Sequence, residues 1–186
     1  PPDTSNEKNL VQLKDEIKSN KSSIGFAYDG DGDRIIVLKG NGDIIWPDQL
    51  MILFSRSILK NNRDAKIVYD VKCTKHLEDE IIKNNGIPVL SRTGHSFIKK
   101  AMIKEKALLG GEMSGHIFFA DKWKGFDDGI YASIRLLEIL SNNENYEEIL
   151  NDLPVSVTTP EINIPFSGNN HFTFMDLFAK LTKFDN

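Results

Sequence analysis

Short apolar runs alternate with segments of helical periodicity between residues 48 and 141, and this alternation limits the possible fold more than any other feature of the chain. Strands separated by helices are typical of an α/β domain, because parallel strands need a crossover connection between them. We therefore expect a mixed, largely parallel sheet flanked by helices. The expected strands are 66–69, 87–90 and 107–110, and the expected helices are 48–59, 74–84, 96–105 and a long one that ends at Leu140.

Polar residues at the start of these helices predict where each begins. Asp48, Thr74 and Ser96 are the expected N-caps, and either Asp127 or Asp128 is expected to cap the long helix. Side chains of these types accept hydrogen bonds from the N–H groups that the first helical turn leaves unpaired.

The segments on either side of this domain are too short to form cores of their own. Residues 1–46 hold an expected helix, 7–19, and an expected hairpin of strands 24–28 and 35–38 followed by a run at 44–46. Residues 153–186 hold an expected strand, 155–164, and an expected helix, 173–183. We predict three parts, 1–46, 47–152 and 153–186, of which the outer two are partial neighbouring domains. Since the chain opens at Pro1 without an initiator Met, we expect a piece of a longer protein.

The run Asp29–Arg34, with the sequence Asp-Gly-Asp-Gly-Asp-Arg, is the strongest chemical signal; we call it the aspartate loop. Carboxylates this close repel one another unless a cation lies among them, and the glycines let the backbone curl so that the side chains converge. Hard oxygen ligands suit Mg²⁺ or Ca²⁺. A solvated turn is the simplest alternative. An EF-hand is excluded because Arg34 and Gly40 occupy the positions that need Gly and Glu.

Polar residues also follow each expected strand, where open α/β sheets bind ligands. Lys72 follows the first strand, Arg92 and His95 follow the second, and the run 112–116 (Glu-Met-Ser-Gly-His) follows the third. Cations offset phosphate charge, a carboxylate and a hydroxyl can bind sugar hydroxyls, and His116 can carry a proton near neutral pH. The set fits a phosphorylated polyol. Each residue also has a structural alternative, as a solvated surface charge, a helix cap or an ordinary strand connection.

Bulk composition excludes little. The 186 residues are 40% hydrophobic and 27% charged, with a net charge of −4 that gives no reason to expect nucleic acid or a membrane surface as partner. Cys73 is the single cysteine, so an intrachain disulfide is impossible. No apolar run approaches the length of a membrane span, and no signal-peptide pattern is present. We expect a cytoplasmic protein.

Five motifs in order resemble the α-D-phosphohexomutase family, most closely its bacterial phosphomannomutase/phosphoglucomutase branch. They are Asp29–Arg34, Asp70–Thr74, Arg92–Ser96, Gly111–His116 and Gly125–Gly129. The resemblance runs from about residue 2 to residue 165. It implies that 1–46 ends the family's second domain, that 47–152 is its third and that 153–186 begins its fourth.

The resemblance also implies roles for individual residues. Asp29, Asp31 and Asp33 match Mg²⁺ ligands, and Arg34 matches an arginine beside the phosphoryl group. Lys72 and His116 are the proton-transfer candidates. His95 and Met113 favour the mannose/glucose branch. The expected substrate-binding set is Lys72, His95, Glu112, Met113, Ser114, Gly115 and His116.

The implied chemistry moves a phosphoryl group from a phosphoserine to a hexose 1- or 6-phosphate through a hexose 1,6-bisphosphate. The chain departs from the family in two motifs, because nothing matches the phosphoserine loop Thr-Ala-Ser-His-Asn-Pro or the phosphate clamp Arg-x-Ser-x-Thr-Glu-Pro. We therefore expect the chain alone to be inactive and to bind Mg²⁺ weakly. Two alternatives remain: a Mg²⁺-dependent sugar-phosphate phosphatase with an aspartate nucleophile, and a non-catalytic sugar-phosphate-binding module.

Overall fold

The computed structural model describes residues 6–155, 165–168 and 170–182 of the chain. Two compact units are present, Pro1–Ser156 and Val157–Asn186, and each is described by itself. No helix among the described residues is both long and apolar enough to cross a membrane.

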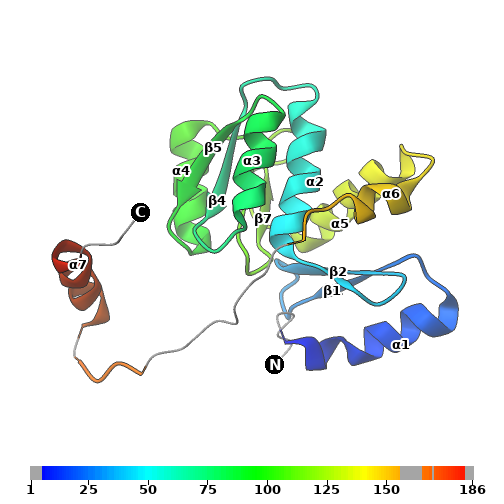
Figure 1. Cartoon of the computed structure of the whole chain (residues 1–186), viewed down its shortest axis with the longest axis horizontal. Helices are drawn as coiled ribbons and strands as arrows, with labels where there is room; N and C mark the ends of the chain where they lie inside the picture. Colours follow the sequence, from blue (N-terminus) through cyan, green and yellow to red (C-terminus); the bar gives the residue numbers. More distant parts are fainter. Residues whose placement is uncertain (1–5, 156–164, 169, 183–186) are drawn as a thin grey trace. The chain divides into compact units, whose positions relative to one another are not determined.

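The centre of the first unit is a four-stranded sheet in the order β5-β4-β6-β7 (Figure 1). Strand β4 pairs in parallel with β5 and β6, and β6 pairs antiparallel with β7. This arrangement confirms the expected mixed, largely parallel sheet; the short strand β7 was not predicted. The strands are β4 (Lys66–Asp70), β5 (Ile87–Ser91), β6 (Leu109–Gly111) and β7 (Ile117–Phe119).

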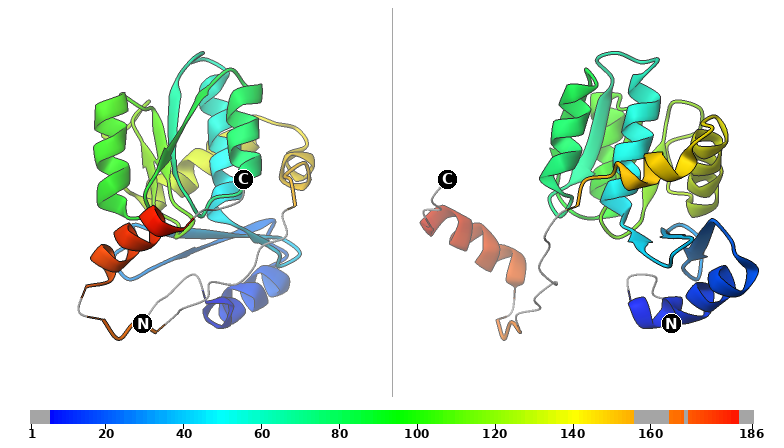
Figure 2. Two further views of the ribbon diagram at one scale, coloured as in Figure 1. Left: turned by 60° about the vertical axis from the view of Figure 1, so that its left-hand side comes forward. Right: turned by 45° about the vertical axis from the view of Figure 1, so that its right-hand side comes forward.

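Helices cover both faces of this sheet, as the turned view in Figure 2 shows. Helices α2 (Pro47–Leu59) and α3 (Lys75–Lys83) lie on one face and α4 (His95–Glu105) on the other. Ile67 and Tyr69 of β4 belong to the core on the α2 and α3 side, whereas Val68 between them packs with the α4 residue Ile98. The alternation follows from the two-residue period of a strand. Helix α5 (Gly129–Ser141) packs against α2 and β7.

Residues 24–45 form a second, antiparallel sheet in the order β1-β2-β3, and helix α1 packs against β1 (Figure 1). Strand β2 is buried on both faces, because Ile36 and Leu38 pack with the α1 residue Ile17 while Ile35 and Val37 join the main core. The hairpin is therefore fixed to the α/β domain by shared core packing. The elements are η1 (Glu7–Leu10), α1 (Val11–Asn20), β1 (Ile24–Tyr28), β2 (Ile35–Lys39) and β3 (Ile44–Ile45).

The expected helix starts are partly confirmed. Thr74 caps α3 by accepting a hydrogen bond from the His76 N–H at 3.3 Å. The predicted caps Asp48 and Ser96 are wrong, because α2 begins after Trp46 and α4 begins after Gly94. The Asp48 carboxylate instead accepts the N–H of Gln49 and the N–H of Thr74, both at 2.9 Å. It therefore connects α2 to the start of α3.

The end of the first unit contains α6 (Tyr146–Asn151), which was not predicted and which begins after the capping residue Asn145. The second unit contains α7 (His171–Leu181), capped by Asn170 and overlapping the helix expected at 173–183. The strand expected at 155–164 lies outside the described residues, apart from Val155.

Candidate functional site

The aspartate loop connects β1 to β2 and brings its carboxylates together. One oxygen from each of Asp29, Asp31 and Asp33 lies within 4.8 Å of the others. The Arg34 N–H donates to Asp29 Oδ1 at 3.1 Å, and Arg34 Nε lies 3.3 Å from Asp29 Oδ2. The loop thus curls as expected, and its own arginine neutralises only one of its carboxylates.

This loop fits a divalent cation. Burial raises the pKa of Asp33, and the nearby charges of Asp29 and Asp31 add to that effect against the opposing influence of His116. Asp33 Oδ1 is buried and has no hydrogen-bond partner in the part of the chain that the structure describes. A hard divalent cation would lower the free energy of this charge cluster, and carboxylate oxygens are the ligands that Mg²⁺ prefers.

Main-chain contacts hold the aspartate loop against the α/β domain. The Ile35 N–H donates to Gly115 O at 3.1 Å, and the Gly129 N–H donates to Gly32 O at 3.0 Å. A Cβ on Gly115 would lie 2.9 Å from Ile35 O, and a Cβ on Gly129 would lie 2.8 Å from Arg34 O. Gly115 also has a φ of +102°, which side-chain-bearing residues rarely adopt. Both positions therefore require glycine.

Asp70 connects the three loops that follow β4, β5 and β6. Its carboxylate is fully buried and accepts hydrogen bonds from the Thr93 hydroxyl at 3.0 Å, the Met113 N–H at 3.2 Å and the Cys73 thiol at 3.1 Å. Charge-assisted hydrogen bonds of this kind are stronger than neutral ones. A single side chain thus fixes the relative positions of three loops that are far apart in sequence.

His116 lies where the aspartate loop meets the loop that follows β6. Its backbone pairs with that of Arg34 in an isolated antiparallel bridge. Its Nδ1 lies 3.2 Å from Glu112 Oε2 and 3.0 Å from Ser114 Oγ, and its Nε2 lies 3.4 Å from Asp33 Oδ1. Burial disfavours the charged imidazole, but the hydrogen bond to Glu112 and the charges of Asp33 and Glu112 outweigh it and raise the pKa of His116. The aspartate loop therefore acts directly on the titration of this histidine.

Glu112 is almost fully buried, with 1% of its surface exposed. Its Oε1 accepts a hydrogen bond from the Gly94 N–H at 2.5 Å, and its Oε2 faces His116. Both carboxylate oxygens therefore face protein groups. In this arrangement Glu112 orients the imidazole, and its predicted contact with substrate stays a prediction.

The remaining predicted residues surround this cluster with different exposures. His95 is 60% exposed and its ring stacks on that of His116 at 5.7 Å between centroids. Met113 and Ser114 are half-buried. Lys72 is exposed in the loop after β4, and the Arg92 guanidinium lies 5.0 Å from the ring centre of Phe97. The loops that follow the three expected strands thus do meet at one edge of the sheet.

Two buried acids near the site, Asp70 and Asp127, had no predicted site role. Asp70 directly follows the strand expected at 66–69, and that position was the available signal; in the structure it is the last residue of β4. Asp127 was expected to share helix capping with Asp128. Asp128 alone caps α5, by accepting the Tyr131 N–H at 2.8 Å. Asp127 instead forms an ion pair with Lys99 at 2.7 Å.

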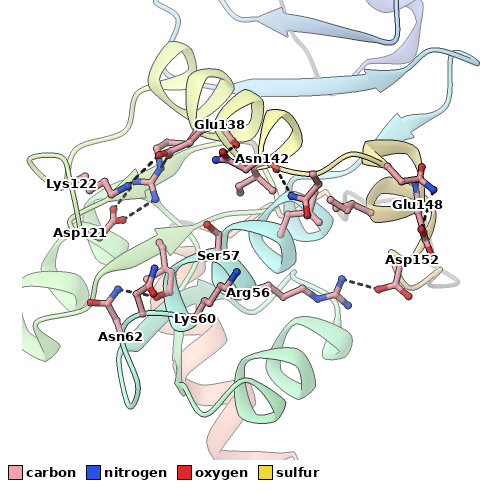
Figure 3. A pocket seen from close by; sticks show the side chains of 18 of the residues that line it. Arg56, Ser57, Lys60, Asn62, Asp121, Lys122, Glu138, Asn142, Glu148 and Asp152 are labelled. Atoms are coloured by element: carbon pink, nitrogen blue, oxygen red, sulfur yellow. Dashed lines mark hydrogen bonds and ion pairs between the residues drawn. The ribbon is translucent and has the colours of Figure 1, made fainter.

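An open pocket of about 960 Å³ lies elsewhere, lined by α2, α5 and α6 (Figure 3). Arg135 binds Asp121 there through two hydrogen bonds of 2.7 and 2.8 Å, and Arg56 donates to Asp152 at 3.0 Å. None of the site residues predicted from sequence lines this pocket. Because these charged groups already pair with one another, we place the candidate site at the aspartate loop.

Comparison with known proteins shows the family of the chain. A family model described as phosphoglucomutase/phosphomannomutase, alpha/beta/alpha domain III, matches residues 46–156, more than half of the chain. The chain belongs to the phosphoglucomutase/phosphomannomutase family. The resemblance inferred from the sequence motifs is therefore confirmed.

Two curated family members show how much of a complete relative the chain represents. It is 49% identical to a phosphoglucomutase from Neisseria meningitidis over 181 residues, which cover 96% of the chain and 39% of that protein. It is 45% identical to a phosphomannomutase/phosphoglucomutase from Pseudomonas aeruginosa, with the same two coverages. The chain thus spans about two fifths of the curated relatives that it matches.

Solved structures of family members share the fold. A phosphoglucomutase/phosphomannomutase family protein from Burkholderia thailandensis superposes with a TM-score of 0.83 at 45% identity, covering 86% of this chain and 35% of that one. A phosphoglucomutase, parafusin, from Paramecium in its open form gives a TM-score of 0.63 at 26% identity, covering 82% and 29%. The mixed α/β architecture is therefore that of the family.

Proposed function

We propose that the polypeptide containing this chain is a Mg²⁺-dependent phosphohexomutase that interconverts hexose 1-phosphate and hexose 6-phosphate, with mannose and glucose as the sugars. The observation that supports it best is the contact between the aspartate loop and His116, held by the Ile35–Gly115 hydrogen bond. Phosphoryl transfer to a hydroxyl requires a cation near the phosphoryl oxygens and a base near the attacking hydroxyl, and here a candidate metal loop is in direct contact with a candidate base.

In this proposal Asp29, Asp31 and Asp33 hold the Mg²⁺. When bound, the ion neutralises charge that develops on the phosphoryl oxygens during transfer. Arg34, 41% exposed at its side chain, adds a guanidinium at the same edge. Its pairing with Asp29 fixes the side chain, so that the cation is already oriented when a phosphoryl group arrives.

His116 is the proposed general base, and Lys72 is the second proton-transfer candidate. As the sugar oxygen bonds to phosphorus, the bond from phosphorus to the serine oxygen breaks and His116 takes the hydroxyl proton. Glu112 holds the imidazole in position and stabilises the imidazolium that forms. Substrate contacts are assigned to Lys72, His95, Met113, Ser114, Gly115 and, through its loop, Glu112.

The remaining domains of the same polypeptide supply the phosphoserine and the clamp for the second phosphate. The chain's share of its relatives, 39% of their length, supports this division. We propose residues 1–46, 47–152 and 153–186 as parts of the second, third and fourth domains. Hexose phosphates are the proposed partners, with the hexose 1,6-bisphosphate as intermediate and no nucleic acid or membrane surface involved, and the proposed location is the cytoplasm.

The test compares the complete polypeptide with this chain. The complete polypeptide should convert glucose 1-phosphate and mannose 1-phosphate to their 6-phosphates, and the chain alone should not. His116→Gln should lower kcat about 10²- to 10⁴-fold, the usual contribution of a general base. His76→Gln, on the exposed start of α3, is the matched control and should leave kcat unchanged. Release of inorganic phosphate in place of isomerisation would replace the proposal with the phosphatase alternative.

A further inference from the structure

Asp127 carries a buried carboxylate oxygen that no hydrogen bond satisfies. The side chain is 8% exposed, and Lys99 binds its Oδ1 at 2.7 Å. Among the described residues, Oδ2 has no hydrogen-bond partner, and His95 Nδ1 lies 3.9 Å from it. An unsatisfied buried oxygen of this kind raises the free energy of the folded state. The observation points to a cation that this oxygen would bind.

His116 presents one ring nitrogen toward the same place. Its Nδ1 lies 3.2 Å from Glu112 Oε2 and 3.0 Å from Ser114 Oγ, so a proton on Nδ1 in the neutral tautomer faces these two oxygens. This leaves Nε2 as an acceptor, which lies 3.4 Å from Asp33 Oδ1 and receives a hydrogen bond from Arg34 Nε at 3.3 Å. Histidine ligands of metal ions usually donate their second N–H to a carboxylate in this manner, because the hydrogen bond fixes both tautomer and ring orientation.

The ligand atoms of Asp33, His116 and Asp127 all lie within 4.8 Å of one another. Asp33 Oδ1, like Asp127 Oδ2, is buried without a hydrogen-bond partner among the described residues. The set differs from the aspartate loop in its chemistry, since imidazole suits transition-metal ions such as Zn²⁺ and Ni²⁺, whereas an all-carboxylate set suits Mg²⁺. The separation of 3.4 Å between Asp33 Oδ1 and His116 Nε2 is also close to that of two ligands on one tetrahedral Zn²⁺, which bind at about 2.0–2.2 Å.

We propose that Asp33, His116 and Asp127 form a second divalent-cation site, which takes Zn²⁺ or a similar transition-metal ion and shares Asp33 with the aspartate loop. Three protein ligands leave the remaining positions of the ion open to solvent. His95, stacked on His116 and 3.9 Å from Asp127 Oδ2, is placed to fill one of them.

Two neighbouring cationic side chains, Arg34 and Lys99, leave room for a metal ion at this site. Arg34 Nε lies 3.3 Å from His116 Nε2, where the metal would bind, but it also lies 3.3 Å from Asp29 Oδ2. Arg34 therefore keeps a carboxylate partner when the metal takes the imidazole. Lys99 binds the other oxygen of Asp127, so it lowers the affinity of the site without occupying it.

Sharing Asp33 makes the two sites interdependent. A transition-metal ion bound to Asp33 withdraws one carboxylate from the Mg²⁺ loop and also covers His116 Nε2. If the proposed mutase activity is correct, micromolar Zn²⁺ should therefore inhibit it by blocking the base. The binding site itself does not depend on that activity, because it can be measured in this chain without substrate.

The experiment titrates the 186-residue chain with Co²⁺, a spectroscopic substitute for Zn²⁺, and records visible absorption. Four- or five-coordinate Co²⁺ with a nitrogen ligand absorbs far more strongly than six-coordinate Co²⁺ with oxygen ligands alone. The expected result is a strong band that Zn²⁺ abolishes and that Mg²⁺ does not. Asp127→Asn should weaken Co²⁺ binding at least about 10-fold, since even outer-shell changes have effects of that size.

Two variants serve as matched controls. Asp31→Asn removes the same charge from an exposed residue of the aspartate loop alone, and should keep the strong band. Lys99→Gln removes the competing cation and should tighten Co²⁺ binding. Far-ultraviolet circular dichroism checks that each variant is folded. A weak oxygen-type spectrum in the unaltered chain, or equal Co²⁺ affinity in the Asp127→Asn and Asp31→Asn variants, would overturn the proposal while leaving the mutase proposal intact.

Discussion

Replacing Gly115 with alanine should loosen the joint between the aspartate loop and the α/β domain. The residue has a φ of +102°, and a Cβ there would lie 2.9 Å from Ile35 O and 3.3 Å from Ile35 N. Both neighbours are main-chain atoms of the buried strand β2, so no side-chain rotation can relieve the contact. The hydrogen bond from Ile35 N to Gly115 O, 3.1 Å long, must lengthen.

The size of the effect follows from three terms. A side chain in a sparsely populated backbone region costs about 1–3 kcal/mol, and weakening one hydrogen bond costs about 0.5–1.5 kcal/mol. The smaller entropy of the unfolded alanine chain offsets about 0.4–1 kcal/mol. Gly115→Ala should therefore lower the free energy of unfolding by about 2–3 kcal/mol, which corresponds to a fall in Tm of about 5–10 °C for a chain of this size.

Gly32→Ala is the matched control, because Gly32 has a φ of +76° but a Cβ there meets nothing within 4 Å. It introduces backbone strain without the contact, so it should lower the free energy of unfolding by only about 1 kcal/mol. Urea unfolding followed by circular dichroism, with EDTA present to exclude metal binding, compares the two variants. Equal unfolding midpoints for Gly115→Ala and Gly32→Ala would refute the argument from close approach.

Three further predictions concern other parts of the chain. Asp121→Asn should destabilise the fold by about 2–3 kcal/mol in urea unfolding, because the buried Arg135 guanidinium loses two charge-assisted hydrogen bonds and keeps only Glu138, among the described residues, as an acidic partner. A loss below about 1 kcal/mol would show that the pair is dispensable. The hydrogen bond from Arg56 lowers the pKa of Glu80 in the folded state. The ionised Glu80 therefore stabilises the fold above its unfolded pKa, and this stabilisation is lost as the pH falls through the lower folded pKa. Glu80→Gln should weaken the dependence of the free energy of unfolding on pH in that acidic range, and an unchanged dependence would contradict this. Burial raises the pKa of the Cys73 thiol, so iodoacetamide at pH 8 should alkylate it far more slowly than a free cysteine, as mass spectrometry would detect; alkylation at the rate of free cysteine would disprove it.

Elements with one dominant apolar pattern were predictable from the sequence. Strand β4 reads as an unbroken apolar run because helices cover both of its faces, and its bounds agree with the expected 66–69 to within one residue. Helix α6 was missed because it begins among Asn and Glu residues, and its burial of Leu150 depends on tertiary packing. Strand β7 has three residues, too few to show a period.

The sequence predicted which residues each loop contributes to the site, but not the contacts that residues of different loops make with one another. The carboxylates of the aspartate loop lie close together in sequence, so their convergence could be inferred directly. The bond from the Met113 N–H to Asp70 spans 43 residues and exists because β4 and β6 are neighbours in the sheet. The contact of Asp127 with Lys99 likewise depends on how α4 and the start of α5 approach each other. Contacts of this kind depend on which elements are neighbours in the fold, and the local sequence does not specify that.

The docking of the aspartate loop through main-chain groups has a consequence for how such proteins can recombine. The domain that sequence comparison recognises begins at residue 46, so its boundary separates the aspartate loop from the histidine that it contacts. A chimaera joined at that boundary must rebuild the contact from two unrelated parents. The loop is held there by backbone N–H and C=O groups, so its docking tolerates changes in neighbouring side chains provided that positions 115 and 129 remain glycine. In this chain, therefore, Gly115 and Gly129 are what a domain exchange at that boundary would have to preserve.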